Sequence, residues 1–328
     1  MKIISQDEVE KQFSIQTESP KENAKLTHIS NPHNITFKCN ADLSLSQYLE
    51  FENFTTKHYQ NVCVINLPFF DNFCHNIIDI LPELIHIDNS SKYDLILAKH
   101  SKITDDFINT FKIKFQKIKF VKTSCDLTPQ SIDLYNYYMH SQRQTHKSLK
   151  LRETLLQQIK ITPTPNKLIY CTRNTGGGAN HGRKIKPTNE DLIIKISKEY
   201  AKAYDLDFVI FDGCNEGGSR MSIIEQANLF SRAKIVAGPH GGAFANIIYI
   251  PTENHCKVCE FTSGKYTAVQ SVPDFGKNYN RLLGFAPQTY LDYYLIPFEI
   301  GSNAEETFIN IDNYKSFMQS CSFNNQLT

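Results

Sequence analysis

Short apolar runs rich in β-branched residues alternate with longer amphipathic segments along most of this chain, and that alternation constrains its fold more than any other feature. The pattern is clearest after residue 166, where strands are predicted at residues 167–172, 207–211, 234–237 and 256–261 and helices at residues 189–204, 220–232 and 243–250. Thr188 with Asp191, and Ser222 with Glu225, are predicted capping boxes. Strands joined by helices run parallel, because each helix returns the chain to the same end of the sheet. The alternation therefore predicts an α/β fold built on parallel sheets.

An earlier part of the chain repeats this alternation. Strands are predicted at residues 61–67, 93–98 and 118–123, and helices at residues 72–87 and 104–115. Pro163 and Pro165 then stop a polar helical stretch. We therefore predict an N-terminal domain at residues 1–160, a second domain at residues 161–300, and a helical segment at residues 301–328 that could pack back on the N-terminal domain. Ligands of such folds bind at the carboxyl ends of the strands.

Charge and apolar content exclude several classes of protein. The 328 residues carry 35 basic and 34 acidic side chains, and a net charge of +1 gives no electrostatic footprint for nucleic acid. Acidic residues interrupt the first 13 positions before any signal-peptide core, and apolar runs such as residues 243–251 reach about half of the ~20 residues that a membrane-spanning helix needs. We expect a cytoplasmic chain with no transmembrane segment and with nine reduced cysteines, and a homodimer is left open.

Residues 234–251 carry the clearest candidate for ligand binding. A predicted strand leads into Gly238-Pro239-His240-Gly241-Gly242, and a predicted helix follows at once. Small residues let the backbone approach a ligand, and a helix N-terminus presents N–H groups and the positive end of its dipole. This chemistry suits a diphosphate, to which His240 could donate a further hydrogen bond. The alternative is a tight turn that holds a structural histidine.

A second candidate lies at residues 170–186. Arg173 follows a predicted strand, a glycine-rich loop comes next, and Arg183 precedes the next helix. Arginine presents a fork of donors that matches phosphate oxygens, and the loop could close over a ligand. The alternative is a surface loop with solvated charges. Farther along, Glu260 stands at the end of a predicted strand, where a carboxylate can bind ribose hydroxyls.

The helix predicted at residues 72–87 places polar side chains opposite its apolar stripe. Asn72, His75 and Asp79 share that face, and His75 and Asp79 are one turn apart. A carboxylate beside an imidazole can accept a proton from a hydroxyl, although a merely solvated polar face has the same spacing. A metal would need a third ligand that the local sequence does not supply, so no metal is expected.

Taken in order, these segments resemble glycosyltransferase family 61. The family's N-x-x-H-x-x-x-D-x-x-P helix and its two arginines with a following Asn-Glu pair are matched by Asn72, His75, Asp79, Pro82, Arg173, Arg183, Asn189 and Glu190. Its Glu-Gln helix, its H-G-A/G-x-x-x-N stretch and two downstream positions are matched by Glu225, Gln226, His240, Gly241, Gly242, Asn246, Pro251 and Glu260. Two features depart from the family pattern: Asn76 replaces the usual aromatic, and glycines are inserted at residues 176–178.

The resemblance implies the GT-B architecture, with two Rossmann-like domains, the acceptor mainly in the N-terminal one and the donor mainly in the C-terminal one. It also implies an inverting, metal-independent transfer of a sugar, xylose or N-acetylglucosamine, from a UDP-sugar to a glycan hydroxyl, with no cofactor. Asp79, assisted by His75, would be the base, Asn72 would lie on the acceptor side, and the matched residues between Arg173 and Glu260 would bind the donor. The alternatives are a catalytically silent module that binds a sugar nucleotide or glycan, and a transferase of another group such as pyruvyl.

Overall fold

The computed structural model describes residues 2–4, 24–30, 35–36, 57–66, 73, 94–97, 102–110, 117–120, 126–137, 156–157, 164–176, 184–263, 292–300 and 307–321. The chain forms two compact units, of which one is Ser19–Leu151 and the other combines Met1–Glu18 with Arg152–Thr328. The first residues of the chain therefore belong to the same unit as its C-terminal half. No helix in these described ranges is long and apolar enough to cross a membrane.

The Ser19–Leu151 unit is built on a mostly parallel sheet. Its elements are β2 (Ala24–Ser30), β3 (Ile35–Thr36), β4 (Lys57–Asn66), β5 (Asp94–Leu97), α5 (Lys102–Thr110), β6 (Lys117–Phe120) and β7 (Asp126–Tyr137). The strand order is β2-β7-β4-β5-β6, in which β7, β4, β5 and β6 run parallel while β2 and β3 pair antiparallel with β7. The strands predicted at residues 61–67, 93–98 and 118–123 and the helix at 104–115 are confirmed by β4, β5, β6 and α5, whereas β7 was not predicted.

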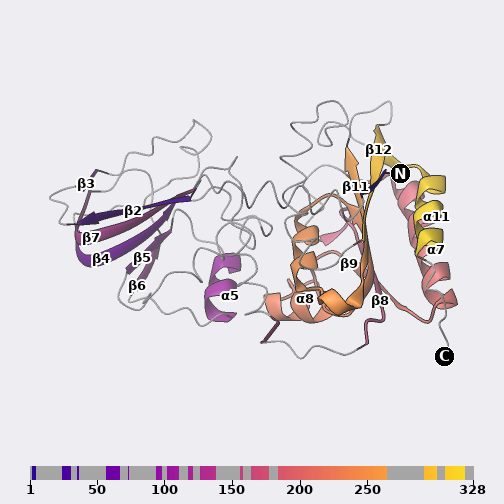
Figure 1. Cartoon of the computed structure of the whole chain (residues 1–328), viewed down its shortest axis with the longest axis horizontal. Helices are drawn as coiled ribbons and strands as arrows, with labels where there is room; N and C mark the ends of the chain where they lie inside the picture. The colour runs from indigo at the N-terminus through magenta and orange to yellow at the C-terminus, as the bar shows by residue number, and fades with distance from the viewer. Residues whose placement is uncertain are drawn as a thin grey trace. The chain divides into compact units, whose positions relative to one another are not determined.

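The second unit contains the larger sheet (Figure 1). Its strands are β1 (Lys2–Ile4), β8 (Lys167–Cys171), β9 (Asp207–Phe211), β10 (Ala233–Pro239), β11 (Lys257–Ser263), β12 (Asp292–Ile300) and β13 (Thr307–Ile309). The five strands β9-β8-β10-β11-β12 lie side by side and all run parallel, and β1 and β13 pair antiparallel with the outer edge of β12. Chain order reverses between β8 and β10, because the connections from these two strands lead to opposite edges of the sheet. Parallel sheets bind ligands beside such a switch point.

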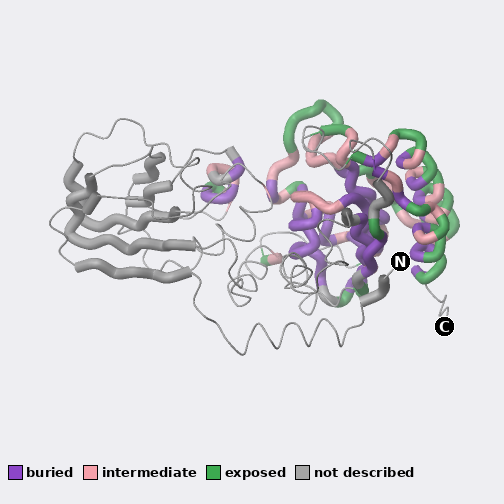
Figure 2. The backbone as a smooth tube through the Cα atoms, turned by 90° about the horizontal axis from the view of Figure 1, so that it is seen from above, coloured by how far each residue is buried: buried purple, intermediate pink, exposed green. Residues whose placement is uncertain are grey.

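Helices cover both faces of this sheet. Helices α7 (Pro187–Ala203) and α11 (Ile311–Ser320) lie on one side, and α8 (Ile223–Phe230) lies on the other (Figure 1). The α/β fold with a parallel sheet predicted from the alternation is therefore confirmed. Figure 2 shows that the buried residues of this unit concentrate in the strands and in the inner faces of the helices. Alternate strand residues, such as Leu168 and Tyr170, face α7 and α11, as the period of two in a strand requires.

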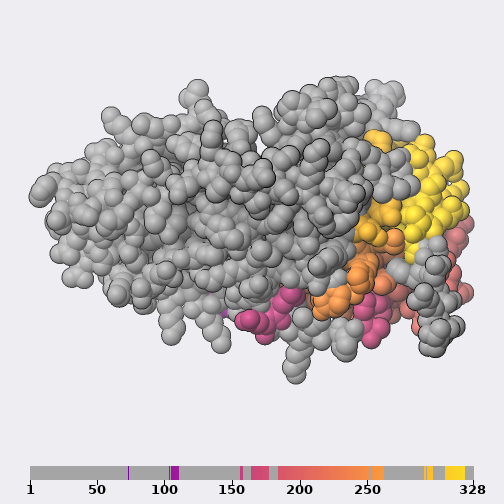
Figure 3. Space-filling model, in the orientation of Figure 1, coloured from indigo at the N-terminus to yellow at the C-terminus, as the bar shows by residue number. Residues whose placement is uncertain are grey.

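The C-terminal segment packs within the second unit. The described part of residues 301–328 lies on α7 and β12. Packing of this segment on the N-terminal domain, which the sequence suggested, stays a prediction. Tyr314, Phe317 and Met318 form a buried stripe at helical spacing, and the Tyr314 hydroxyl lies 2.7 Å from Ser197 Oγ of α7. That stripe is complementary to the apolar face that α7 leaves beside the sheet. The outer side of α11 is at the surface in Figure 3.

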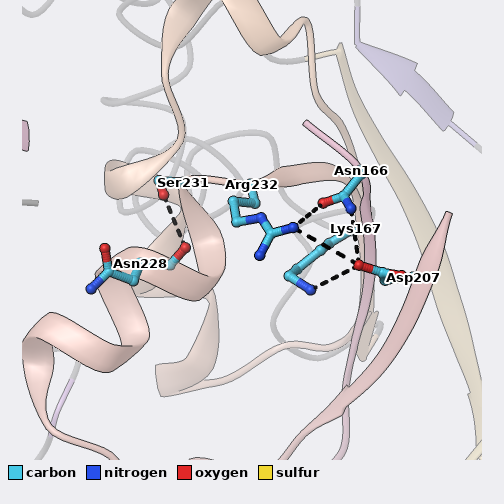
Figure 4. A network of polar contacts seen from close by, with 6 residues as sticks. All are labelled: Asn166, Lys167, Asp207, Asn228, Ser231 and Arg232. Carbon is cyan, nitrogen blue, oxygen red and sulfur yellow. Dashed lines mark hydrogen bonds and ion pairs between the residues drawn. The ribbon is translucent and has the colours of Figure 1, made fainter. Parts of the chain in front are cut away.

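A polar network holds the amino ends of β8 and β9 together (Figure 4). The Asp207 carboxylate accepts hydrogen bonds from Asn166 Nδ2 at 2.9 Å and from Lys167 Nζ at 3.2 Å. Arg232, which follows α8, donates from Nη2 to Asn166 Oδ1 at 3.0 Å. The network joins the first residues of β8 and β9 to Arg232 after α8. It lies at the amino ends of these strands, opposite to their carboxyl ends.

Candidate functional site

The carboxyl end of β8 is held by one buried carboxylate. Glu190, in the first turn of α7, accepts hydrogen bonds from the Tyr170 hydroxyl at 3.0 Å, from Thr172 Oγ1 at 2.7 Å and from Asn174 Nδ2 at 2.5 Å. Burial and the neighbouring Glu190 raise the pKa of Tyr170 well above its ordinary value, so this hydroxyl stays a donor at every physiological pH. Arg173 lies between Thr172 and Asn174, two of the three residues that donate to Glu190.

The carboxyl end of β10 lies directly beside that of β8. Gly238 has φ +150° there, and a Cβ at this position would lie 2.3 Å from the backbone oxygen of Cys171. Only glycine permits this approach of the two strands. Next along the chain, the His240 N–H donates to the carbonyl of Phe261 in β11 at 2.7 Å. The turn after β10 is thus fastened to the strands on both sides of it.

Arg173 spans the switch point between β8 and β10. Its Nη1 donates to the backbone oxygen of His240 at 3.2 Å. The guanidinium also lies over Gly241, since a Cβ on that glycine would be 2.1 Å from Nη1. The structure therefore brings together Arg173, His240 and Gly241, three of the residues that the sequence selected from two separate segments.

The Glu260 carboxylate binds the ring of His240 through Nδ1. Glu260 is buried, with 7% of its side chain exposed, and 24% of the His240 side chain is exposed. A carboxylate is an acceptor, so this contact assigns the proton to Nδ1 and leaves Nε2 as the ring atom available to a ligand. The sequence placed Glu260 at a strand end, whereas β11 continues to Ser263 and the carboxylate contacts the imidazole of His240. Ribose binding by Glu260 stays a prediction.

The helix after this turn is a 3₁₀ helix, η4 (Gly242–Tyr249), and not the α-helix that the pattern suggested. Gly241 is its N-cap residue, and no side chain caps it. Asn246 lies inside η4, fully buried, and donates from Nδ2 to Gln226 Oε1 of α8 at 3.0 Å. Asn246 therefore joins η4 to α8, while Gly241 and Gly242 form the start of the helix beside Arg173.

Two other predicted site residues, Glu225 and Asn189, make contacts that hold parts of the fold together. Glu225 forms a capping box with Ser222 at the start of α8, as predicted. Asn189 binds the backbone of Ile309 in β13 in both directions, with Oδ1 accepting at 2.8 Å and Nδ2 donating at 3.0 Å. The capping box predicted for Thr188 was wrong, because α7 begins at Pro187, two residues before the predicted start, and its N-cap residue, Lys186, has no side-chain cap.

Four of the predicted residues cannot be placed on this site. Asn72, His75, Asp79 and Arg183 lie outside the described residues, although Phe73 within the predicted helix is helical. Among the residues that the structure describes, no group of three His, Cys, Asp or Glu side chains is arranged to hold a metal ion. Cys256 and Cys259 are buried free thiols, and burial raises the pKa of both.

The family model described as Glycosyltransferase 61 matches residues 73–259, which is more than half of the 328 residues. The chain belongs to glycosyltransferase family 61. The match runs from the segment of His75 and Asp79 to Cys259 of β11, one residue before Glu260, so the family resemblance inferred from the ordered motifs is confirmed. It includes both halves of the candidate site, β8 with Arg173 and β10 with His240.

No protein with a curated description matches the chain. Among solved structures, the chain is similar to the bacterial iron-containing dodecameric glycosyltransferase TibC from enterotoxigenic E. coli H10407, with 11% sequence identity and a TM-score of 0.33. The alignment covers 64% of this chain and 60% of that one.

Proposed function

We propose that this member of glycosyltransferase family 61 transfers a sugar from a UDP-sugar to a glycan hydroxyl, with xylose or N-acetylglucosamine as the sugar. The observation that carries the proposal is the position of Arg173, whose guanidinium crosses from β8 to the backbone of His240 and Gly241 at the switch point of the sheet. Parallel α/β sheets bind nucleotide ligands at such a point. A guanidinium beside an uncapped helix start is suited to a diphosphate.

The two units would act as the acceptor-side and donor-side domains of a GT-B enzyme. In the donor site Arg173 and the start of η4 would contact the diphosphate, and His240 would meet it through Nε2. These groups would stabilise the negative charge that develops on the departing UDP, a task for which many transferases use a metal ion. We therefore propose a transfer that needs no divalent metal.

The proposed reaction is a single displacement with inversion. The acceptor hydroxyl gives its proton to Asp79 while its oxygen forms the new bond to the anomeric carbon. The bond from that carbon to the diphosphate oxygen breaks, and UDP leaves with the electron pair. His75, one helical turn from Asp79 in the sequence, would assist the carboxylate.

Arg173→Ala tests the donor site. Loss of a contact that strengthens in the transition state should cost ~2–4 kcal/mol, or roughly 30- to 1,000-fold in turnover. UDP affinity measured by calorimetry should fall as well, while Arg173→Lys, which keeps the charge and loses the fork, should recover only part of it. Wild-type UDP affinity in Arg173→Ala would remove the proposed site.

Donor turnover separates the proposal from its rivals. A silent binding module would bind UDP-sugars without releasing UDP, and a transferase of another group would leave UDP-sugars intact. Activity that disappears in EDTA and returns with Mn²⁺ would contradict the metal-independent mechanism.

The acceptor-side assignment predicts that Asp79→Asn lowers turnover by ~10²–10⁴ with UDP affinity unchanged. If His75→Ala costs as much or more, His75 is the base and Asp79 only orients it.

A further inference from the structure

Three side chains at the end of β8 and in the turn that follows it converge on a single buried carboxylate. Tyr170 lies in β8, whereas Thr172 and Asn174 follow its last residue, Cys171. Tyr170 and Thr172 both donate to Glu190 Oε1, and Asn174 donates to Oε2. Glu190 is 7% exposed, Tyr170 is fully buried and Thr172 is 6% exposed.

Arg173 is the residue between two of these anchored positions. The contacts of Thr172 and Asn174 with Glu190 fix the chain immediately before and after Arg173. The Arg173 guanidinium reaches the carbonyl of His240 and the backbone of Gly241. The second hydrogen of the Asn174 amide goes to the carbonyl of Ile185 at 2.8 Å, so the residues just before α7 are tied to the same point.

We propose that Glu190 is the positioning residue of the Arg173 site: it holds the backbone on both sides of Arg173 and so determines where the guanidinium meets the donor diphosphate. This inference rests on the proposed function. The family resemblance assigned Glu190 to the donor itself, but both carboxylate oxygens are occupied by donors of the protein, and a carboxylate beside a diphosphate would repel it. Glu190 acts through Arg173.

Two variants of Glu190 separate positioning from loss of structure. Glu190→Gln can keep all three contacts, because the hydroxyls of Tyr170 and Thr172 can accept from the amide nitrogen while the amide oxygen accepts from Asn174. Its affinity for UDP should stay within about twofold of wild type. Glu190→Ala removes all three contacts, and its affinity for UDP should fall about 10-fold or more. A loss of this size is seen when residues that position metal ligands are removed.

Thr172→Val provides a milder variant that removes one hydrogen bond next to Arg173 and keeps the side-chain shape. Its affinity for UDP should fall about threefold, which would place it between the affinities of wild type and Glu190→Ala. Asp312→Ala is the matched control, since it removes a first-turn carboxylate from α11 that contacts Lys315. UDP affinity of this control should equal that of wild type. Calorimetry with UDP and thermal melting of every variant are the measurements.

The outcomes distinguish the inference from the function on which it rests. If Arg173→Ala loses UDP affinity while folded Glu190→Ala binds UDP as wild type does, the positioning role is overturned. If Glu190→Ala does not fold, Thr172→Val decides in the same way. If Arg173→Ala itself binds UDP normally, the proposed donor site fails instead.

Discussion

Two strand-to-helix turns at the carboxyl ends of strands in the second unit's sheet both contain a pair of glycines and have different structures. The turn from β9 to α8 contains Gly213, Gly217 and Gly218, and the turn from β10 to η4 contains Gly241 and Gly242. At the start of α8, Ser222 Oγ accepts from Glu225 N, and the Glu225 carboxylate accepts from Ser222 N at 2.6 Å. At the start of η4, the N-cap residue is a glycine with no side-chain cap.

The comparison of the two turns shows that glycine content alone does not identify an anion site. The positive end of α8 already has a carboxylate of the protein beside it, which accepts from the backbone N–H of Ser222 and would repel a phosphate. The start of η4 has an arginine over its N-cap glycine instead. The cation that the protein places at a helix start, and not the glycine content of the turn, therefore marks the start of η4 as a candidate anion site.

Gly238→Ala should produce the largest change in stability. A Cβ at Gly238 would meet a backbone oxygen at 2.3 Å in a conformation that side chains rarely adopt, so we expect a loss of ~2–4 kcal/mol in the free energy of unfolding. Gly213→Ala, in the turn before α8, is the control: φ is +84°, but nothing lies within 4 Å of the added Cβ. Chemical denaturation should show the smaller loss for Gly213→Ala, and equal losses would contradict the close contact of β10 with β8.

Gly241→Ala should mainly affect ligand affinity. The added Cβ would lie 2.1 Å from Arg173 Nη1, the far end of a flexible side chain, so the guanidinium can move and the fold can survive. We expect UDP affinity to fall about tenfold, or ~1.4 kcal/mol. Gly217→Ala has nothing within 4 Å of its Cβ and should bind UDP as wild type does. An unchanged UDP affinity in Gly241→Ala would mean that the position of Arg173 over Gly241 does not matter for the donor.

Ser222→Ala should destabilise the turn before α8 without touching the donor site. Removing an N-cap hydroxyl costs ~1 kcal/mol of stability. Thermal melting and UDP calorimetry on the same preparation test this directly. A Ser222→Ala protein with weakened UDP binding would mean that the start of α8, despite its own carboxylate, takes part in the donor site.

The smallest effect concerns pH and the same capping box. Hydrogen bonds from the Ser222 backbone and then from its side chain lower the pKa of Glu225 below 4.5. A lowered pKa contributes stability that is present above the unfolded value and is lost as pH falls through the folded value. The difference in melting temperature between wild type and Glu225→Gln should therefore shrink as the pH is lowered from 7 to below 4. A difference that grows on acidification would contradict the capping role.

The strands of the second sheet were predictable because each is a local pattern. Residues 207–211 match β9 end for end, and the strands around them were located within a few residues, since β-branched runs bounded by polar turns need no partner to be recognised. Strand β12 was missed. Pro297 interrupts its pattern, and it is a strand because β11, β1 and β13 pair with it. Pairing between distant segments leaves no local signal.

The residues of the candidate site show the same division. The sequence selected Arg173, His240 and Gly241 because an arginine or a glycine-rich turn after a strand is a local feature with a known affinity for phosphate. It assigned Glu190, Glu225 and Glu260 to ligand as well, since a carboxylate in a motif carries no mark of its partner. In the structure these three carboxylates contact Thr172 after β8, the N-cap of α8 and the ring of His240, and their binding to a ligand stays a prediction.

The order and spacing of residues were enough to identify the family, the α/β class and the two segments that we propose to bind the donor, because both can be read without coordinates. The pairing of β8 with β10 at the switch point could be seen only in the three-dimensional structure. This pairing places Arg173 over Gly241, 68 positions farther along the chain. The tertiary structure also decided which polar groups face each other in the interior. A buried carboxylate must be satisfied by donors from whichever strand packs against it, and that neighbour is set by the sheet order and not by the local sequence.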